Sequence, residues 1–144
     1  MLGRIKESII IQAPPERIWD MLIFDRFPEW NETFGERVEY TSEVHTPEDK
    51  YRVGATARGI PKKPGDVCCR FEMKESLEHE KIAFRAWEET KYFGTLSMLP
   101  TYSLEPVGTA TKFTYELESD FWGIFGKFLF KLFAITLEKQ VEKS

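Results

Sequence analysis

Histidine and cysteine are scarce in this sequence of 144 residues. It contains two histidines and two cysteines, and the cysteines, Cys68 and Cys69, are adjacent. An adjacent pair forms neither a CxxC motif nor a disulfide framework, and the distant histidines lack the spacing of a metal site. We therefore expect ordinary strand positions for the cysteines, no metal, no cofactor and a reducing, cytoplasmic location.

A surplus of positive charge is also missing. Twenty lysines and arginines are outnumbered by 24 acidic residues, which gives a net charge of -4 and a pI near 5.3. Domains that bind nucleic acid usually carry a clustered basic surface, whereas the basic residues here are scattered. The composition argues against nucleic acid as a partner.

Long uninterrupted hydrophobic runs are absent as well. Before Pro14 the N-terminal region has only the three isoleucines 9–11, which do not make the apolar region of a signal peptide. The most apolar segment lies near the C-terminus, where Lys127 and Lys131 interrupt a stretch of about 17 residues, the lower limit for a bilayer span. We predict no signal peptide and no transmembrane span, and peripheral contact with a membrane surface stays open.

What the sequence does contain is one long helical pattern, from Ser119 to about Val141. No proline interrupts it, and Ser119 or Asp120 can act as its N-cap. Its apolar arc covers roughly 240°, whereas a helix on a single core needs roughly 100° or somewhat more. The centre of the arc is formed by Phe121, Phe125, Phe128, Leu132 and Ile135, and its flanks by Trp122, Leu129, Phe130, Phe133 and Leu137. Such a surface needs a cover, which could be a curved sheet, an apolar ligand, a second subunit or a membrane.

Most of the remaining sequence predicts β-strands. Alternation of apolar and polar residues and a β-rich composition predict strands at 5–11, 36–41, 52–59, 67–77, 81–89, 92–105 and 112–118. The inward face of 81–89 stays open because both of its faces are apolar. Antiparallel strands with one polar face need a cover for the apolar face, so the pattern predicts one α+β domain over residues 1–144.

Two short helical segments follow the first strand. Proline is tolerated in the first turn of a helix, so residues 15–22 predict a helix that buries Ile18, Trp19 and Leu22. A second short turn follows at 25–30. The loop 44–50 has the composition of an exposed segment.

The N-terminal third resembles a known family. The residues that carry the resemblance are Ile9, Ile11, the run Ala13-Pro14-Pro15-Glu16-Arg17-Ile18-Trp19-Asp20, Asp25 and Pro28-Glu29-Trp30. Together they resemble the N-terminal signature of the START-like superfamily, also called SRPBCC, which includes the polyketide cyclase/dehydrase and lipid transport proteins. Val53-Gly54, Gly108-Thr109 and the apolar C-terminal helix lie where that family has such features, so the resemblance covers nearly the whole chain.

The resemblance implies a helix-grip fold, in which a curved sheet of about seven strands wraps the long C-terminal helix around an apolar cavity. Residues on the inward faces then become the candidates for ligand binding. These are Phe71, Met73, Met98, Tyr102, Phe113, Tyr115, Phe121, Phe125, Phe128 and Leu132.

Three functions fit these features. The first is a carrier or sensor for a hydrophobic small molecule such as a lipid, an isoprenoid or a polyketide-like compound. The second is a cyclase/dehydratase-type enzyme that uses Glu7, Arg85, Tyr102 and Tyr115 in the same cavity. The third is an interaction module in which the helix flank, with Trp122, Phe130, Phe133 and Leu137, contacts a membrane or a second copy. The ligand, the reaction and the choice between monomer and homodimer stay open.

The polar candidates each have an ordinary alternative. Glu7 shares a face with three isoleucines and points either to a cavity or to water at an edge. A buried Arg85 needs a carboxylate partner, from Glu7 or from a ligand. His45 and His79 fall in predicted turns, so they are solvated residues or residues at a pocket mouth. The tyrosines pack in the core or present hydroxyls to a ligand.

Overall fold

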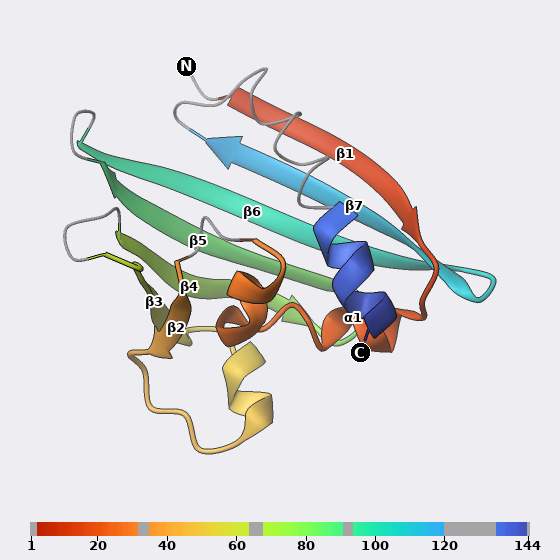
Figure 1. The fold of residues 1–144 in the computed structure, drawn as a ribbon, viewed down its shortest axis with the longest axis horizontal. Coiled ribbons are helices and arrows are strands. Elements are labelled where there is room, and N and C mark those ends of the chain that lie inside the picture. Colours follow the sequence, from red (N-terminus) through yellow and green to blue (C-terminus); the bar gives the residue numbers. More distant parts are fainter. Residues whose placement is uncertain (1–2, 32–34, 64–67, 91–93, 120–134, 144) are drawn as a thin grey trace.

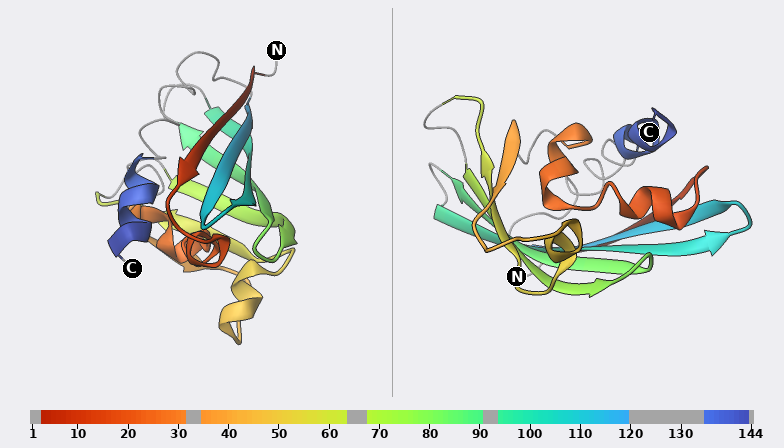
Figure 2. Two further views of the ribbon diagram at one scale, coloured as in Figure 1. Left: turned by 90° about the vertical axis from the view of Figure 1, so that its right-hand side faces the viewer. Right: turned by 90° about the horizontal axis from the view of Figure 1, so that it is seen from below.

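The fold is one curved sheet with short helices on one side (Figure 1). The computed structural model describes residues 3–31, 35–63, 68–90, 94–119 and 135–143. α1, η1 and the C-terminal helical residues 135–143 lie on the same, concave side of the sheet (Figure 2). This arrangement confirms the predicted helix-grip architecture.

Seven strands form the sheet, as predicted. They are β1 (Gly3–Ile11), β2 (Arg37–Tyr40), β3 (Thr56–Ile60), β4 (Cys68–Leu77), β5 (Lys81–Thr90), β6 (Gly94–Val107) and β7 (Ala110–Ser119). Their order is β1-β7-β6-β5-β4-β3-β2, and every neighbouring pair is antiparallel. β1 and β2 are therefore the two edges, and β5 lies at the centre.

The helical elements are short. α1 (Pro15–Trp19) begins with a proline at its first position, and η1 (Phe24–Glu29) is a 3-10 helix. Ile18, Trp19 and Leu22 are buried as predicted. The indole of Trp30 donates a hydrogen bond to the carbonyl of Met21 at 3.0 Å, which fixes the turn between the two helices.

A third short helix corrects the predicted loop at 44–50. η3 (Pro47–Tyr51) is a 3-10 helix whose N-cap, Thr46, forms a capping box with Asp49. The capping box satisfies main-chain donors at the helix start. The helix is therefore stabilised by local hydrogen bonds of polar side chains and not by burial of an apolar face. Apolar periodicity could not reveal it.

The long C-terminal helix agrees with the prediction only in part. Ser119 is the last residue of β7, where it is paired with Gly3 and Met98, so it is not itself helical. The start of the helix, and with it the predicted N-cap, falls outside the described residues. Leu137 is fully buried, whereas Ile135 is 55% exposed. Leu137 therefore lies in the chain's own core and not on the outer contact surface of the interaction-module alternative, while Ile135, in the centre of the apolar arc, is not covered by the sheet. The predictions for Trp122, Phe130 and Phe133 fall outside the described residues.

Candidate functional site: the concave face of the sheet

The concave face gathers the sequence-predicted ligand-binding residues that the structure describes. Side chains of alternate residues point to one face of a strand, and the register places Tyr102 opposite Tyr115 and Leu104 opposite Phe113. The buried candidates are Phe71, Met73, Tyr102, Phe113 and Tyr115. Met98 is half-buried and packs against them. Phe121, Phe125, Phe128 and Leu132 fall outside the described residues.

One end of this face is filled by the chain itself. We call it the phenylalanine end, defined by Phe71, Met73 and Phe84. The ring of Phe24 stacks on Phe71 at 5.4 Å, and the ring of Phe27 lies 5.2 Å from Phe84. Both η1 residues are fully buried. Phe71 and Met73 therefore form hydrophobic core beneath η1.

Phe24, Phe27 and Phe84 were not singled out from the sequence. The apolar alternation of β5 left its inward face open, and the structure shows that Ile82, Phe84 and Ala86 are the inward set. Phe84 pairs with Met73 in the antiparallel register, but the pairing shifts by one residue between Met73 and Glu75. A regular hairpin register counted from the turn at 78–80 would therefore have paired Phe84 with the wrong residue of β4 and assigned the opposite face.

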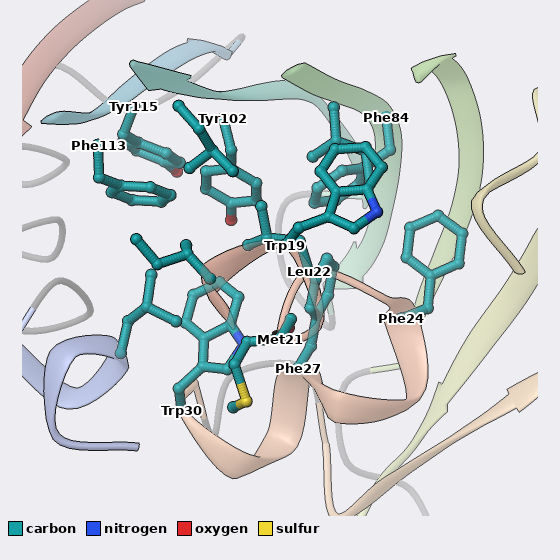
Figure 3. Packing of buried hydrophobic residues seen from close by; sticks show 14 of the residues in the cluster. Trp19, Met21, Leu22, Phe24, Phe27, Trp30, Phe84, Tyr102, Phe113 and Tyr115 are labelled. Atoms are coloured by element: carbon teal, nitrogen blue, oxygen red, sulfur yellow. Dashed lines mark hydrogen bonds between the residues drawn. The ribbon is translucent and has the colours of Figure 1, made fainter. Parts of the chain in front are cut away.

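The other end of the face is different in chemistry. We call it the tyrosine end, defined by Met98, Tyr102, Phe113 and Tyr115. The rings of Tyr102 and Tyr115 stack at 5.2 Å, and Tyr102 also stacks on Phe113 at 5.5 Å. Trp30 approaches Tyr102 edge-on at 5.8 Å. Figure 3 shows the hydroxyls of both tyrosines pointing away from the sheet, toward the side of the helices.

The two tyrosines bring neutral polar groups into an apolar setting. Burial raises the pKa of both phenols well above the usual range, so they remain protonated donors. Among the residues that the structure describes, none forms a hydrogen bond with the Tyr102 hydroxyl. A phenol in this position can donate to a carbonyl or hydroxyl oxygen of a bound molecule.

Two carboxylates share the concave face. Glu7 lies opposite Tyr115 in the β1–β7 register and is half-buried at the edge of the sheet. Glu88, which was not singled out from the sequence, lies between Cys69 and Leu96 in the register, near the far ends of β4 and β5. Burial raises the pKa of Glu88. These are the titratable candidates for proton transfer at this face.

Arg85 does not belong to the site. It alternates with the inward residues of β5 and points to the convex face, where its Nη1 donates to the Ser97 hydroxyl at 2.8 Å. The proposed set of Glu7, Arg85, Tyr102 and Tyr115 therefore does not converge. The outward orientation of Arg85 could not be predicted from the sequence, because its strand is apolar on both faces and the pattern does not indicate which face is inward.

A second, polar surface lies between α1, η3 and the β4–β5 turn. A groove of about 460 Å³ is lined by residues that include Trp19, Tyr51 and His79. Trp19 stacks on Tyr51 at 4.8 Å, and the Tyr51 hydroxyl donates to the Trp19 carbonyl at 2.9 Å. His79, in the turn, meets Trp19 edge-on at 6.1 Å, while His45 is an exposed residue beside Glu43.

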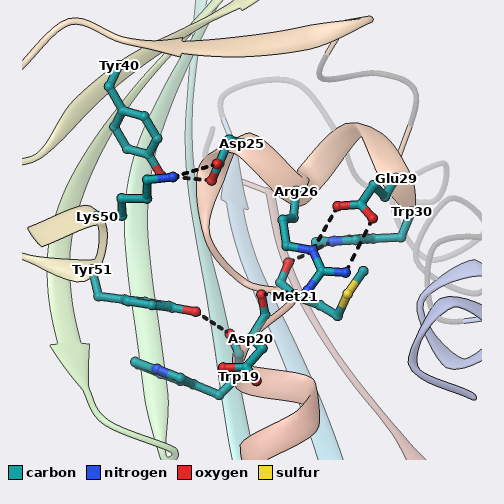
Figure 4. Close-up of polar contacts among 10 residues, drawn as sticks. All are labelled: Trp19, Asp20, Met21, Asp25, Arg26, Glu29, Trp30, Tyr40, Lys50 and Tyr51. Atoms are coloured by element: carbon teal, nitrogen blue, oxygen red, sulfur yellow. Dashed lines mark hydrogen bonds and ion pairs between the residues drawn. The ribbon is translucent and has the colours of Figure 1, made fainter. Parts of the chain in front are cut away.

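The short helices are also held together by Asp25. Its carboxylate accepts hydrogen bonds from the Tyr40 hydroxyl at 3.2 Å and from the Lys50 ammonium at 2.8 Å (Figure 4). These contacts link η1 to β2 and η3. Asp25, one of the signature positions, thus has a structural role.

In the described ranges, no group of three or more histidines, cysteines or acidic residues is arranged to hold a metal ion. None of the helices described there is both long enough and apolar enough to cross a membrane.

Comparison with solved structures supports the fold. Mll3558 from Rhizobium loti has a TM-score of 0.74 and 15% identity over 96% of each chain. CV1439 from Chromobacterium violaceum has a TM-score of 0.70 and 17% identity, covering 97% of this chain and 98% of the other. Ara h 8.0201 has a TM-score of 0.66 and 10% identity over 100% of both chains. Similarity at such low identity establishes the architecture alone.

The sequence comparisons add the family. A search among curated protein sequences finds no match. A family model described as polyketide cyclase / dehydrase and lipid transport matches residues 3–144. Together with the seven-stranded helix-grip sheet, this match shows that the chain belongs to the polyketide cyclase/dehydrase and lipid transport family of the START-like, or SRPBCC, superfamily.

Proposed function

We propose that the chain binds a hydrophobic small molecule against the tyrosine end of the concave face, as a carrier or sensor. The observation that supports this most is the pair of stacked tyrosines, Tyr102 and Tyr115, whose hydroxyls point away from the sheet among apolar side chains. A lipid, isoprenoid or polyketide-like compound with one carbonyl or hydroxyl group matches that chemistry. The family match supports a hydrophobic ligand in general.

Such a ligand needs no reactive residue to bind well. Burying ten methylene groups contributes on the order of 8 kcal/mol, and lost translational and rotational freedom offsets several kcal/mol of it. A hydrogen bond to a buried tyrosine adds direction and selectivity at a net gain of about 1 kcal/mol. The apolar part of the molecule therefore supplies most of the affinity.

Mass spectrometry of small molecules extracted from the purified protein tests this proposal. We expect an apolar compound to be retained through purification, and a neutral apolar fluorophore, 1-aminoanthracene, to bind saturably and be displaced by it. Ser103→Ala, beside Tyr102 in sequence but on the other face of β6, serves as a matched control for Tyr102→Phe. A protein that retains no compound and does not bind the fluorophore would contradict the proposal.

A cyclase/dehydratase-type enzyme using the same face is the second candidate. It is favoured by Glu88, a half-buried carboxyl whose pKa is raised by burial, because such a group holds its proton more tightly and is suited to act as a general acid. Turnover of the retained compound by the wild type, lost in Glu88→Gln with binding kept, would favour this candidate over a carrier.

The remaining expectations are a cytoplasmic location and a monomer or homodimer. The third function, an interaction module, loses Leu137 from its proposed contact surface because that residue is buried in the chain's own core. Sedimentation of the purified protein would show whether it is a monomer or a dimer. Co-sedimentation with liposomes would show whether it binds a membrane surface.

A further inference from the structure

On the convex face of the sheet, two arginines lie opposite each other in a way that does not stabilise the fold. Arg58 of β3 lies directly opposite Arg70 of β4 in the antiparallel register. Like charges at directly opposed positions destabilise a sheet. The arrangement occurs in a protein whose net charge is -4, so it is a local exception.

The two arginines differ in their partners. Arg58 forms an ion pair with Glu39 at 3.1 Å. Arg70 forms no ion pair or hydrogen bond with any residue in the described part of the chain. Its guanidinium carbon lies 5.8 Å from the centre of the Trp87 ring, and Trp87 is its register partner on β5. A guanidinium with unused donors therefore lies beside an indole.

These residues line a groove of about 470 Å³, which we call the convex groove. The hydroxyl residues Thr41 and Thr56 lie along it with Arg58, Arg70 and Trp87. The lining also includes one carboxylate, Glu72, but this residue pairs with Lys74 and lies opposite Arg85 on β5. Its negative charge is therefore offset by Lys74, just as Glu39 offsets Arg58. Among the described residues that line the groove, the positive charge of Arg70 is left over.

We propose that the convex groove binds an anionic group, a phosphate or a carboxylate, carried on a flat aromatic body. Planar guanidinium groups donate pairs of hydrogen bonds to both kinds of anion. The anion accepts hydrogen bonds from Arg70 and Arg58 and removes the repulsion between them, while the aromatic body packs on the indole of Trp87. The volume lies within the range of small-molecule sites. This site is independent of the concave face, which is on the other side of the sheet.

Phenyl phosphate is a suitable probe, with inorganic phosphate and phenol as its two separate halves. In a titration of nitrogen-15-labelled protein we expect phenyl phosphate to shift the backbone amides of β3, β4 and β5 around Arg58, Arg70 and Trp87. Arg70→Gln should weaken the affinity about tenfold, because a hydrogen bond between charged groups is lost. Arg4→Gln removes the same charge from an exposed position on β1 and should change the affinity less than twofold.

The comparison of probes separates the parts of the proposal. Inorganic phosphate should bind more weakly than phenyl phosphate at the same amides, and Trp87→Leu should reduce the difference between the two. Equal losses in Arg70→Gln and Arg4→Gln, or amide shifts scattered over the molecule, would overturn the site. Equal affinity for phosphate and phenyl phosphate would overturn the aromatic part of the proposed ligand.

Discussion

Arg17 in α1 donates a hydrogen bond from Nη2 to the main-chain carbonyl of Val141 in the C-terminal helical segment. The two residues are 124 positions apart in the sequence. Carbonyls in the last turn of a helix have no partner within the helix and carry partial negative charge. The cation of α1 therefore satisfies the end of the helix that covers the concave face, next to the fully buried Val141 side chain.

Replacing this cation should loosen the contact between the two ends of the chain. We expect Arg17→Met to lower the free energy of unfolding by about 1.5–3 kcal/mol, the range for a hydrogen bond that involves a charged group. Urea denaturation measures this change. Arg4→Met, in an exposed surface ion pair, is the control and should cost about 1 kcal/mol or less. Equal stability of the two variants would show that the contact contributes nothing specific.

Gly35 should be the least replaceable glycine described in the structure. It has a φ of +99°, and an added Cβ would lie 2.6 Å from the carbonyl oxygen of Ile60. Gly54 has a similar φ of +92° but open space around it. Backbone strain of about 1–3 kcal/mol applies to alanine at either position, and only Gly35→Ala adds a collision. Thermal unfolding should therefore rank Gly35→Ala below Gly54→Ala, and the reverse order would contradict this.

Glu88 should make stability depend on pH. Burial raises its pKa above the ordinary value of 4.5, so the native state binds this proton more tightly than the unfolded chain does. The free energy of unfolding therefore falls as the pH rises from the unfolded pKa through the native pKa. Glu88→Gln should remove this fall and raise the urea midpoint at pH 7. The exposed control Glu105→Gln should leave the profile unchanged, and parallel profiles for wild type and Glu88→Gln would contradict the assignment.

The strands could be predicted from the sequence because one face of each is buried. In 67–77 and 112–118, alternation identified the apolar set correctly, and it placed Phe71, Met73, Phe113 and Tyr115 on the inward face before any register was known. The same reasoning failed for Arg85, whose strand has small or apolar residues on both sides. Face assignment there needs the neighbouring strand, which is information about tertiary structure.

The helices were less predictable for a related reason. A helix whose apolar arc is very wide does not reveal which part of that arc packs on the sheet, so the sequence left open that Leu137 is buried and Ile135 is exposed. The residues of the tyrosine end were predicted from the sequence. Their contact with Trp30 was not, because it depends on how η1 packs over the sheet. Glu88 was missed because it follows an apolar run and resembles an ordinary solvent-exposed strand end.

Binding of a hydrophobic molecule at the tyrosine end can be tested directly through the methionines. Met98 belongs to that end, Met73 lies deeper at the phenylalanine end, and Met21 is buried beneath Trp30. In a protein with carbon-13-labelled methionine methyl groups, we predict that 1-aminoanthracene shifts the Met98 signal most and gives a nuclear Overhauser effect to it. Saturable binding that leaves Met98 unchanged would contradict the account.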